Sequence, residues 1–214
     1  MITNKMTIAE AIKTNPEIIQ ILSEENIDYC CGGNRPLEEA VEEKKLDTDS
    51  FIDLLNRQKK KSNNKAENPL VLNKDDLIAY IIRTHHVTEL ELLDEIDKNL
   101  QKLINVHYEK HGKELSDIYA AFMEIKTDLI PHFAKEEKRE FPDFIADKEV
   151  DFSELQEEHE HVGDMLKALA MKANEYRAPD DGCLTYRHTF ELLKKLQDDI
   201  HNHIFLENSV LFLK

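Results

Sequence analysis

Two stretches of the sequence place a histidine and a glutamate four residues apart on what should be an apolar helix face. His132 and Glu136 lie in "PHFAKEEKREF", and His203 and Glu207 lie in "NHIFLENSVLF". A spacing of i, i+4 puts both side chains of each pair on the same side of a helix. Imidazole and carboxylate groups both bind divalent and trivalent metals. The two pairs therefore predict a metal site.

The two other long helical segments each carry a histidine on their apolar seam as well. His159 follows the seam of one segment, between Leu155 and Val162. In the other segment His85 and His86 compete for the position, because both have apolar neighbours. We prefer His85, since the residues around it keep the seam spacing: Ile78, Ile81 and Leu92.

These side chains would be costly in a bundle core without a metal. A buried carboxylate is destabilising unless it is paired or metal-bound, and no Lys or Arg is in phase with Glu136 or Glu207. A single buried histidine is usually a hydrogen-bonded core residue, but one on each of four seams is not a set of independent accidents. The set has too many ligands for one zinc and suits two irons. Its members are His85, His132, Glu136, His159, His203 and Glu207.

The elements that must position these residues are long helices. The apolar spacing predicts helices over about 74–107, 113–142, 152–177 and 181–212. Seam steps of three and four residues indicate helices packed nearly parallel or antiparallel. Short connections make the arrangement an antiparallel up-down-up-down four-helix bundle. With 5 Gly and 6 Pro in 214 residues, we expect an all-α fold.

A smaller unit precedes the bundle. Residues 1–57 predict a small helical domain, in which "TIAE" has the spacing of a capping box and "NP" offers an Asn cap. Residues 58–73 are polar and are the predicted linker, and residues 74–214 form the predicted bundle. "SELQ" predicts a second capping box, at the start of the third bundle helix.

The small domain contains two adjacent cysteines, Cys30 and Cys31, in "DYCCGG". Neighbouring cysteines close only a strained disulfide ring, so we expect free thiols in a reducing compartment. They could be small side chains that fill a turn beside two glycines. Alternatively, they form a thiol pair that accepts iron, exchanges disulfides or contacts a client cluster. We favour the second interpretation and take both as candidate catalytic residues.

Charge and hydropathy exclude several classes of function. The formal net charge is −16, and an acidic surface repels phosphate backbones and anionic lipid, so we expect neither nucleic-acid nor membrane binding. No apolar run approaches the length of a membrane span, and the first residues lack the apolar core of a signal peptide. We therefore expect a cytoplasmic protein.

Taken together, these motifs resemble a known family. The bundle resembles a hemerythrin-like domain, and with "DYCCGG" the chain resembles the iron–sulfur cluster repair di-iron proteins (the RIC proteins) from about residue 7 to the end. The resemblance also rests on "HFAKEE", "EEHEHVG" and "HIFLENSVLF". It implies repair of clusters damaged by nitric oxide or peroxide, with damaged iron–sulfur proteins as clients and iron donation as the means.

The resemblance also implies roles for the six candidate ligands. The four histidines would be terminal ligands of two non-haem iron ions, with an oxo or hydroxo bridge between the metals. Glu136 and Glu207 would be bridging carboxylates. Oxygen-carrying hemerythrins would have a further histidine where Gly163 stands, and their last carboxylate where Asn208 stands. The departures imply a more open and more labile centre.

Two other functions fit the same residues. One is a nitric oxide reductase that forms nitrous oxide at the di-iron centre. The other is a module that binds O2 or NO reversibly as a sensor or store. The sequence allows a homodimer and does not fix the metal in the cell, because iron and manganese share these ligands.

Overall fold

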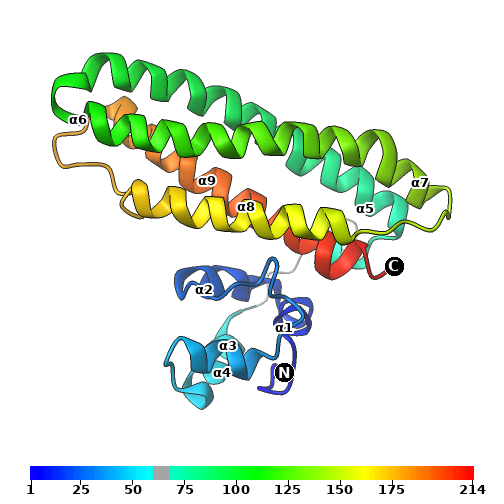
Figure 1. Cartoon of the computed structure of the whole chain (residues 1–214). Coiled ribbons are helices and arrows are strands. Elements are labelled where there is room, and N and C mark those ends of the chain that lie inside the picture. The colour runs from blue at the N-terminus through cyan, green and yellow to red at the C-terminus, as the bar shows by residue number, and fades with distance from the viewer. Residues whose placement is uncertain (60–67) are drawn as a thin grey trace. The chain divides into compact units, whose positions relative to one another are not determined.

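The computed structural model describes residues 1–59 and 68–214, and its regular elements in these ranges are helices without any strand (Figure 1). One isolated bridge pairs Thr7 with Pro36. The prediction of an all-α fold is confirmed. The up-down-up-down order of the bundle stays a prediction.

The chain divides into two compact units. One contains Met1–Leu77 together with Asn202–Lys214, and the other contains Ile78–His201. The predicted division instead kept residues 74–214 together. The boundary near the C-terminus falls inside one helix, α9 (Leu184–Leu206). Residues 60–67 of the predicted linker lie outside the described residues.

The first unit is built from short helices. They are α1 (Ile8–Thr14), η1 (Pro16–Ile18), α2 (Ile19–Glu24), α3 (Leu37–Glu43), α4 (Thr48–Arg57) and η3 (Pro69–Val71). The predicted capping box is confirmed, because the Thr7 hydroxyl accepts from the Glu10 N–H and the Glu10 carboxylate accepts from the Thr7 N–H. Asn15 caps η1, with Pro16 at the first helical position, as predicted. Fully buried aliphatic side chains, such as Ile12 and Leu37, form the core.

The second unit contains longer helices. Its elements are the end of α5 (Lys74–Ile81), η4 (Ile82–His86), α6 (Val87–Lys135), η5 (Glu136–Glu140), α7 (Phe141–Ile145), α8 (Ser153–Lys172) and most of α9. The expected break between the first two bundle helices lies at His107 (φ −110°, ψ 16°), where a kink joins the two helical arms of α6. The two arms of α6 run alongside α8 and α9 (Figure 1). The η6 turn (Glu207–Leu211) follows α9.

The predicted capping box at the start of α8 is wrong. The helix begins at Ser153, and its N-cap residue Phe152 makes no side-chain cap. The Asp151 carboxylate instead accepts from the Ser153 N–H at 3.0 Å. Asp151 therefore satisfies the Ser153 N–H, which the Gln156 side chain of a capping box would have reached.

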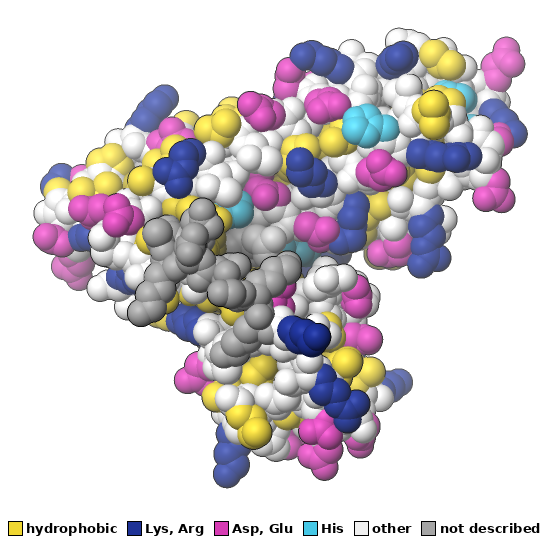
Figure 2. Space-filling view, turned by 180° about the vertical axis from the view of Figure 1, so that it is seen from behind, with side chains coloured by type: hydrophobic (Ala, Val, Ile, Leu, Met, Phe, Trp, Pro, Cys, Tyr) yellow, Lys and Arg dark blue, Asp and Glu magenta, His cyan; other side chains and the backbone are white. Residues whose placement is uncertain are grey.

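The seam positions form the core of the second unit. Leu92, Ile96, Ile118, Phe122 and Leu166 are at most 4% exposed. On the face shown in Figure 2, acidic and basic side chains alternate over the surface and hydrophobic ones are scattered between them. Among the described residues, no helix combines the length and the apolar character needed to cross a membrane.

Candidate metal centre

Three π-helical turns mark the positions of the candidate ligands. The turn η4 ends at His86, η5 begins at Glu136, and η6 begins at Glu207. A π turn has i→i+5 hydrogen bonds, so it inserts one residue into the helical repeat and changes the face that following side chains occupy. Such turns occur frequently at functional sites. The chain thus departs from regular helix where the predicted ligands stand.

The turn η4 corrects the choice between His85 and His86. Before it, the buried seam passes through Ile78 and Ile81. After it, the buried positions continue in steps of three and four from His86: Glu89, Leu93, Ile96, Leu100 and Leu103. The inserted residue moves the seam by one position. The structure therefore brings His86 to Glu136, whereas His85 was predicted.

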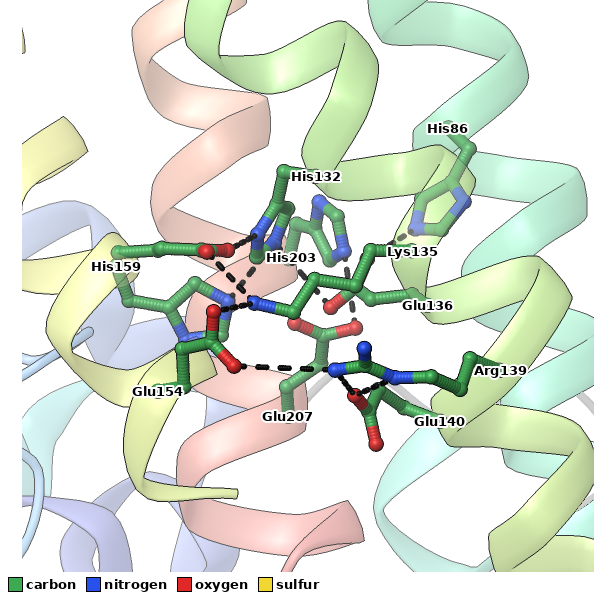
Figure 3. Close-up of polar contacts among 11 residues, drawn as sticks. His86, His132, Lys135, Glu136, Arg139, Glu140, Glu154, His159, His203 and Glu207 are labelled. Carbon is green, nitrogen blue, oxygen red and sulfur yellow. Dashed lines mark hydrogen bonds and ion pairs between the residues drawn. The ribbon is translucent and has the colours of Figure 1, made fainter. Parts of the chain in front are cut away.

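Glu136 lies between two imidazoles (Figure 3). Its Oε1 is 3.2 Å from Nε2 of His132, and its Oε2 is 3.3 Å from Nε2 of His86. The Glu136 side chain is fully buried. A carboxylate whose two oxygens face different imidazoles has the arrangement required of a bridge between two metal ions.

His159 adds a third imidazole. Its Nε2 is 3.2 Å from Nε2 of His132, and the side chain is 1% exposed. His132, Glu136 and His159 each offer a ligand atom, and these atoms lie within 4.8 Å of one another. Of the predicted ligands in the second unit, the structure thus brings three together and replaces the fourth by its neighbour.

The outer nitrogen of two of these imidazoles faces a carboxylate. Nδ1 of His86 is 2.8 Å from Glu137, and Nδ1 of His132 is 2.7 Å from Glu158. Lys135 donates to Glu158 at 2.7 Å. Burial alone raises the pKa of Glu158, but the hydrogen bonds from Lys135 and His132 outweigh it and leave this pKa lowered. Glu158 is therefore an anion that accepts the Nδ1 proton.

The contacts of Nδ1 influence whether Nε2 of the same ring carries a proton or presents a lone pair. With Nδ1–H donating outward, a neutral imidazole presents a lone pair at Nε2. In a neutral ring of His86 or His132 that lone pair would face an oxygen of Glu136, 3.2–3.3 Å away, and a cation between the two atoms would bind both. Two ligand atoms about 2.1 Å from one metal ion are about 3.0 to 3.4 Å apart. The donor set and its spacing fit a bound cation.

His203 and Glu207 form a second pair, described within the first compact unit. His203 lies in the last turn of α9, and Glu207 opens η6. The His203 Nε2 is 3.1 Å from Oε1 of Glu207, and the two residues are 1% and 0% exposed. This is the i, i+4 geometry of His132 and Glu136. The predicted pairing is present in both helices.

The structure gives His85 a different setting. Its Nδ1 lies 3.0 Å from Oδ2 of Asp199, and the buried Glu89 offers an oxygen to the same group. The sequence pattern did not indicate Glu89 or Asp199 as ligands. Glu89 could have been found by continuing the seam from His86 in steps of three and four. The Asp199 contact had no comparable signal, because it joins two helices.

Cys30 and Cys31 lie together in the first unit, with Sγ atoms 3.8 Å apart. Asp28 accepts hydrogen bonds from the Cys31 and Gly32 backbone N–H groups and from the Cys30 thiol. Cys30 is buried and Cys31 is half-buried. The hydrogen bond with Cys31, burial and the Asp28 charge raise the pKa of Cys30 well above its ordinary value. Cys30 is therefore a protonated thiol at neutral pH.

The two glycines after the cysteines allow close packing. Neither has a positive φ, so backbone conformation does not require them. A Cβ at Gly33 would lie 2.5 Å from Oγ of Ser209, and a Cβ at Gly32 would lie 2.7 Å from the Asp28 carbonyl oxygen. The turn needs glycine because other atoms occupy the space of a side chain.

Models of two protein families match the chain. A model of the hemerythrin HHE cation binding domain matches residues 77–214, and a model of a domain of unknown function, DUF542, matches residues 4–59. The first range contains all of the histidines and glutamates of the candidate centre.

Relatives match the chain over almost its whole length. The iron-sulfur cluster repair protein ScdA of Staphylococcus haemolyticus is 31% identical over 224 residues, which cover 100% of this chain and 99% of the relative. ScdA of Staphylococcus epidermidis is 29% identical over 225 residues, with the same coverage. The iron-sulfur cluster repair protein YtfE of Dickeya chrysanthemi is 28% identical over 211 residues, covering 96% of this chain and 94% of the relative.

Proposed function

Since the chain belongs to the hemerythrin HHE cation-binding family, and is related over its whole length to iron–sulfur cluster repair proteins, we propose that it repairs damaged iron–sulfur clusters with a dinuclear iron centre. The observation that carries the proposal is Glu136, a buried carboxylate with each oxygen 3.2–3.3 Å from a different imidazole. That donor set suits two metal ions that share one carboxylate.

We propose six iron ligands: His86, His132, Glu136, His159, His203 and Glu207. The hemerythrin model matches residues 77–214, the range that contains all six. Glu207 repeats the relation of Glu136 to its histidine, with Nε2 to Oε1 distances of 3.1 and 3.2 Å. Both glutamates are proposed bridges.

The surrounding residues hold the imidazoles in one tautomer. Glu137 and Glu158 accept the Nδ1 protons of His86 and His132, and Lys135 holds Glu158 in place. Outer carboxylates of this kind orient the ring and increase its basicity as a ligand. When bound, the iron pair would supply redox and Lewis-acid chemistry. Buried walls around Glu136 would keep water from competing for the same ligand atoms.

We further propose that iron is donated to the client protein as cargo. Gly163, buried in α8, provides no ligand atom at the position where the resemblance implies a further histidine in oxygen carriers. Fewer protein ligands per metal favour exchange over permanent retention. Cys31 is the more accessible of the two thiols and is a proposed contact to the incoming or outgoing iron. A cytoplasmic location and small molecules such as NO or O2 as partners belong to the same proposal.

The test is reactivation of a dehydratase whose cluster has been damaged by NO. Purified iron-loaded protein should restore activity faster than the same concentration of free ferrous iron. A Glu136→Leu, Glu207→Leu double variant should not, because both proposed bridges are gone. Glu160→Gln, an exposed position of α8, is the matched control. Equal reactivation by the double variant or by free iron would contradict iron donation.

The same preparations separate the other functions. Nitrous oxide formed in repeated turnovers, with electrons supplied and no client present, would identify a nitric oxide reductase. Reversible ligand binding that a Cys30→Ala, Cys31→Ala variant retains, without reactivation of any client, would identify a sensor or store. Each outcome contradicts the repair proposal by a different measurement.

A further inference from the structure

A second group of metal-ligating side chains lies within the compact unit of residues 78–201. His85, Glu89 and Asp199 offer ligand atoms that lie within 4.8 Å of one another. Nδ1 of His85 is 3.0 Å from Oδ2 of Asp199. Two ligands at a right angle about one metal ion, each about 2.1 Å away, are about 3.0 Å apart. The distance of 3.0 Å between His85 Nδ1 and Asp199 Oδ2 therefore fits two neighbouring ligands of one metal ion, and it also fits a hydrogen bond.

Charge favours a cation in this group. Glu89 is fully buried and His85 is 5% exposed. Two carboxylates and one imidazole are ligand types that a divalent cation binds, and binding offsets the cost of holding a buried carboxylate.

The turn η4 gives adjacent histidines different partners. Nε2 of His86 faces Glu136, whereas Nδ1 of His85 faces Asp199. In regular helix only one of two adjacent residues lies on the seam. The π turn ends at this dipeptide and allows both rings to be buried, each among carboxylates.

The second group lies close to the proposed dinuclear centre and nearer to solvent. Glu89 follows His86 by three residues, a rise of about 4.5 Å along the helix. The Asp199 side chain is 21% exposed, against 7% for His85, so it is the outermost of the ligands. Exposure thus decreases from Asp199 to Glu89, in the direction that an entering cation would follow.

We propose that His85, Glu89 and Asp199 form a mononuclear site for a divalent cation of the Fe2+ or Mn2+ type, distinct from the dinuclear centre. One imidazole and two carboxylates suit these metals, and three protein ligands leave positions for water. With few protein ligands and an exposed carboxylate, the site binds more weakly than the dinuclear centre. Its role as the position through which iron enters or leaves rests on the proposed function, whereas its binding of a cation does not.

The binding test uses the full chain with the dinuclear centre already loaded with iron. Mn2+ is added, and free Mn2+ is followed by its EPR signal. We expect one saturable Mn2+ per chain, with the iron content unchanged at two. Asp199→Asn should weaken this binding at least 10-fold. Asp198→Asn is the matched control, because Asp198 is an exposed neighbour paired with Lys194, and it should bind like wild type.

A spectroscopic measurement assigns the histidine. Pulsed EPR of the bound Mn2+ should show one nitrogen coupling, and the coupling should be lost in His85→Gln. Absence of saturable Mn2+ binding, or binding unchanged by Asp199→Asn, would overturn the site and leave a hydrogen-bonded pair in its place. In the Glu136→Leu, Glu207→Leu background, which should not hold the iron pair, Asp199→Asn should weaken Mn2+ binding in the same way.

The transit role has its own readout. Release of iron from the loaded protein to a ferrous chelator should be at least 5-fold slower in Asp199→Asn than in Asp198→Asn. Equal release rates, with Mn2+ binding lost in Asp199→Asn, would overturn transit while the cation site stands. If wild type fails to reactivate the dehydratase but binds Mn2+ as described, the proposed function fails and the site remains.

Discussion

The proposed iron-binding end of the second unit and the far end of the α6 arms use similar residues in different ways. At the far end, His107 and His111 each pack edge-on against Tyr186, with ring centroids 5.7 Å apart. Both nitrogens of His111 face carboxylates, Asp181 at 3.3 Å and Glu114 at 3.6 Å, and these are 43% and 40% exposed. The carboxylates remain hydrated, so no metal is required to tolerate them.

The difference lies in what faces the two nitrogens of each ring. At the proposed iron-binding end, His132 has the partly exposed Glu158 outside and the fully buried Glu136 inside. A carboxylate without access to water is costly unless it is paired or metal-bound. Sequence proximity of His and acidic residues therefore does not identify a metal site, whereas burial of the inner carboxylate favours one.

The largest effect should come from removing the inner carboxylate. Glu136→Gln replaces the proposed bridge by a neutral amide, and we expect less than a tenth of the wild-type iron content. Iron analysis on purified protein, with helix content checked by circular dichroism, measures this. The corresponding change at the far end, Glu114→Gln, should leave two irons per chain. Full iron content in Glu136→Gln would remove the contrast between the two ends.

The second largest effect should be a loss of stability when the metal is removed. A ligand that binds the folded state stabilises it by about 4 kcal/mol at 1,000 times its dissociation constant. We expect the iron-free protein to unfold at a lower temperature than the loaded protein by a corresponding amount. Calorimetry on both forms checks this, and His111→Ala should shift both forms equally. A difference of melting temperature that vanishes in His111→Ala would place metal binding at the wrong end.

Replacing the outer carboxylate, Glu158, should have an intermediate effect on metal affinity. Glu158→Gln keeps the shape but weakens the acceptor of the His132 Nδ1 proton, and loss of such a partner costs about 10- to 100-fold in metal affinity. Competition with a chelator gives the affinity. Asp128→Asn, beside the exposed His161, serves as control because that ring is not in the ligand set. An unchanged affinity would mean that Glu158 only pairs with Lys135.

The smallest effect should come from replacing Asp97, a carboxylate that pairs with Lys126 and is not a proposed metal ligand. Asp97 accepts from Lys126 at 2.6 Å and from Tyr119 at 2.9 Å, joining the two arms of α6. The hydrogen bond from Lys126 lowers the pKa of Asp97, although burial opposes it. Asp97→Asn should reduce the free energy of unfolding by about 1 kcal/mol at pH 7.

The pH dependence of that loss has a defined sign. Because the folded-state pKa of Asp97 is depressed, its contribution to stability is present above the ordinary value near 3.8 and is lost as the pH falls below it. Urea unfolding of wild type and Asp97→Asn should therefore differ at pH 7 and converge at acidic pH. Iron content should be the same in both. A difference that persists below the folded-state pKa would assign the effect to packing.

The helical seams show how many buried positions the apolar spacing alone predicts. Steps of three and four residues predicted the buried positions of the second arm of α6 and of α8, including His132, Glu136 and His159. The same rule failed at residues 82–86, because a π turn inserts a residue and no local signal distinguishes it from regular helix. His85 and His86 are both buried, so hydrophobic neighbours could not decide between them.

By itself the sequence determined the helical class, the two His–Glu pairs and the cation chemistry, because these depend on residue type and on spacing along one helix. The tertiary structure decided which of two adjacent histidines meets Glu136, which carboxylates hold the outer nitrogens, and that Glu89 and Asp199 approach His85. Those contacts join residues from different helices or follow a change of helical register. The spacing of residues along one helix shows neither the contacts between helices nor the change of register, because both depend on how neighbouring helices pack.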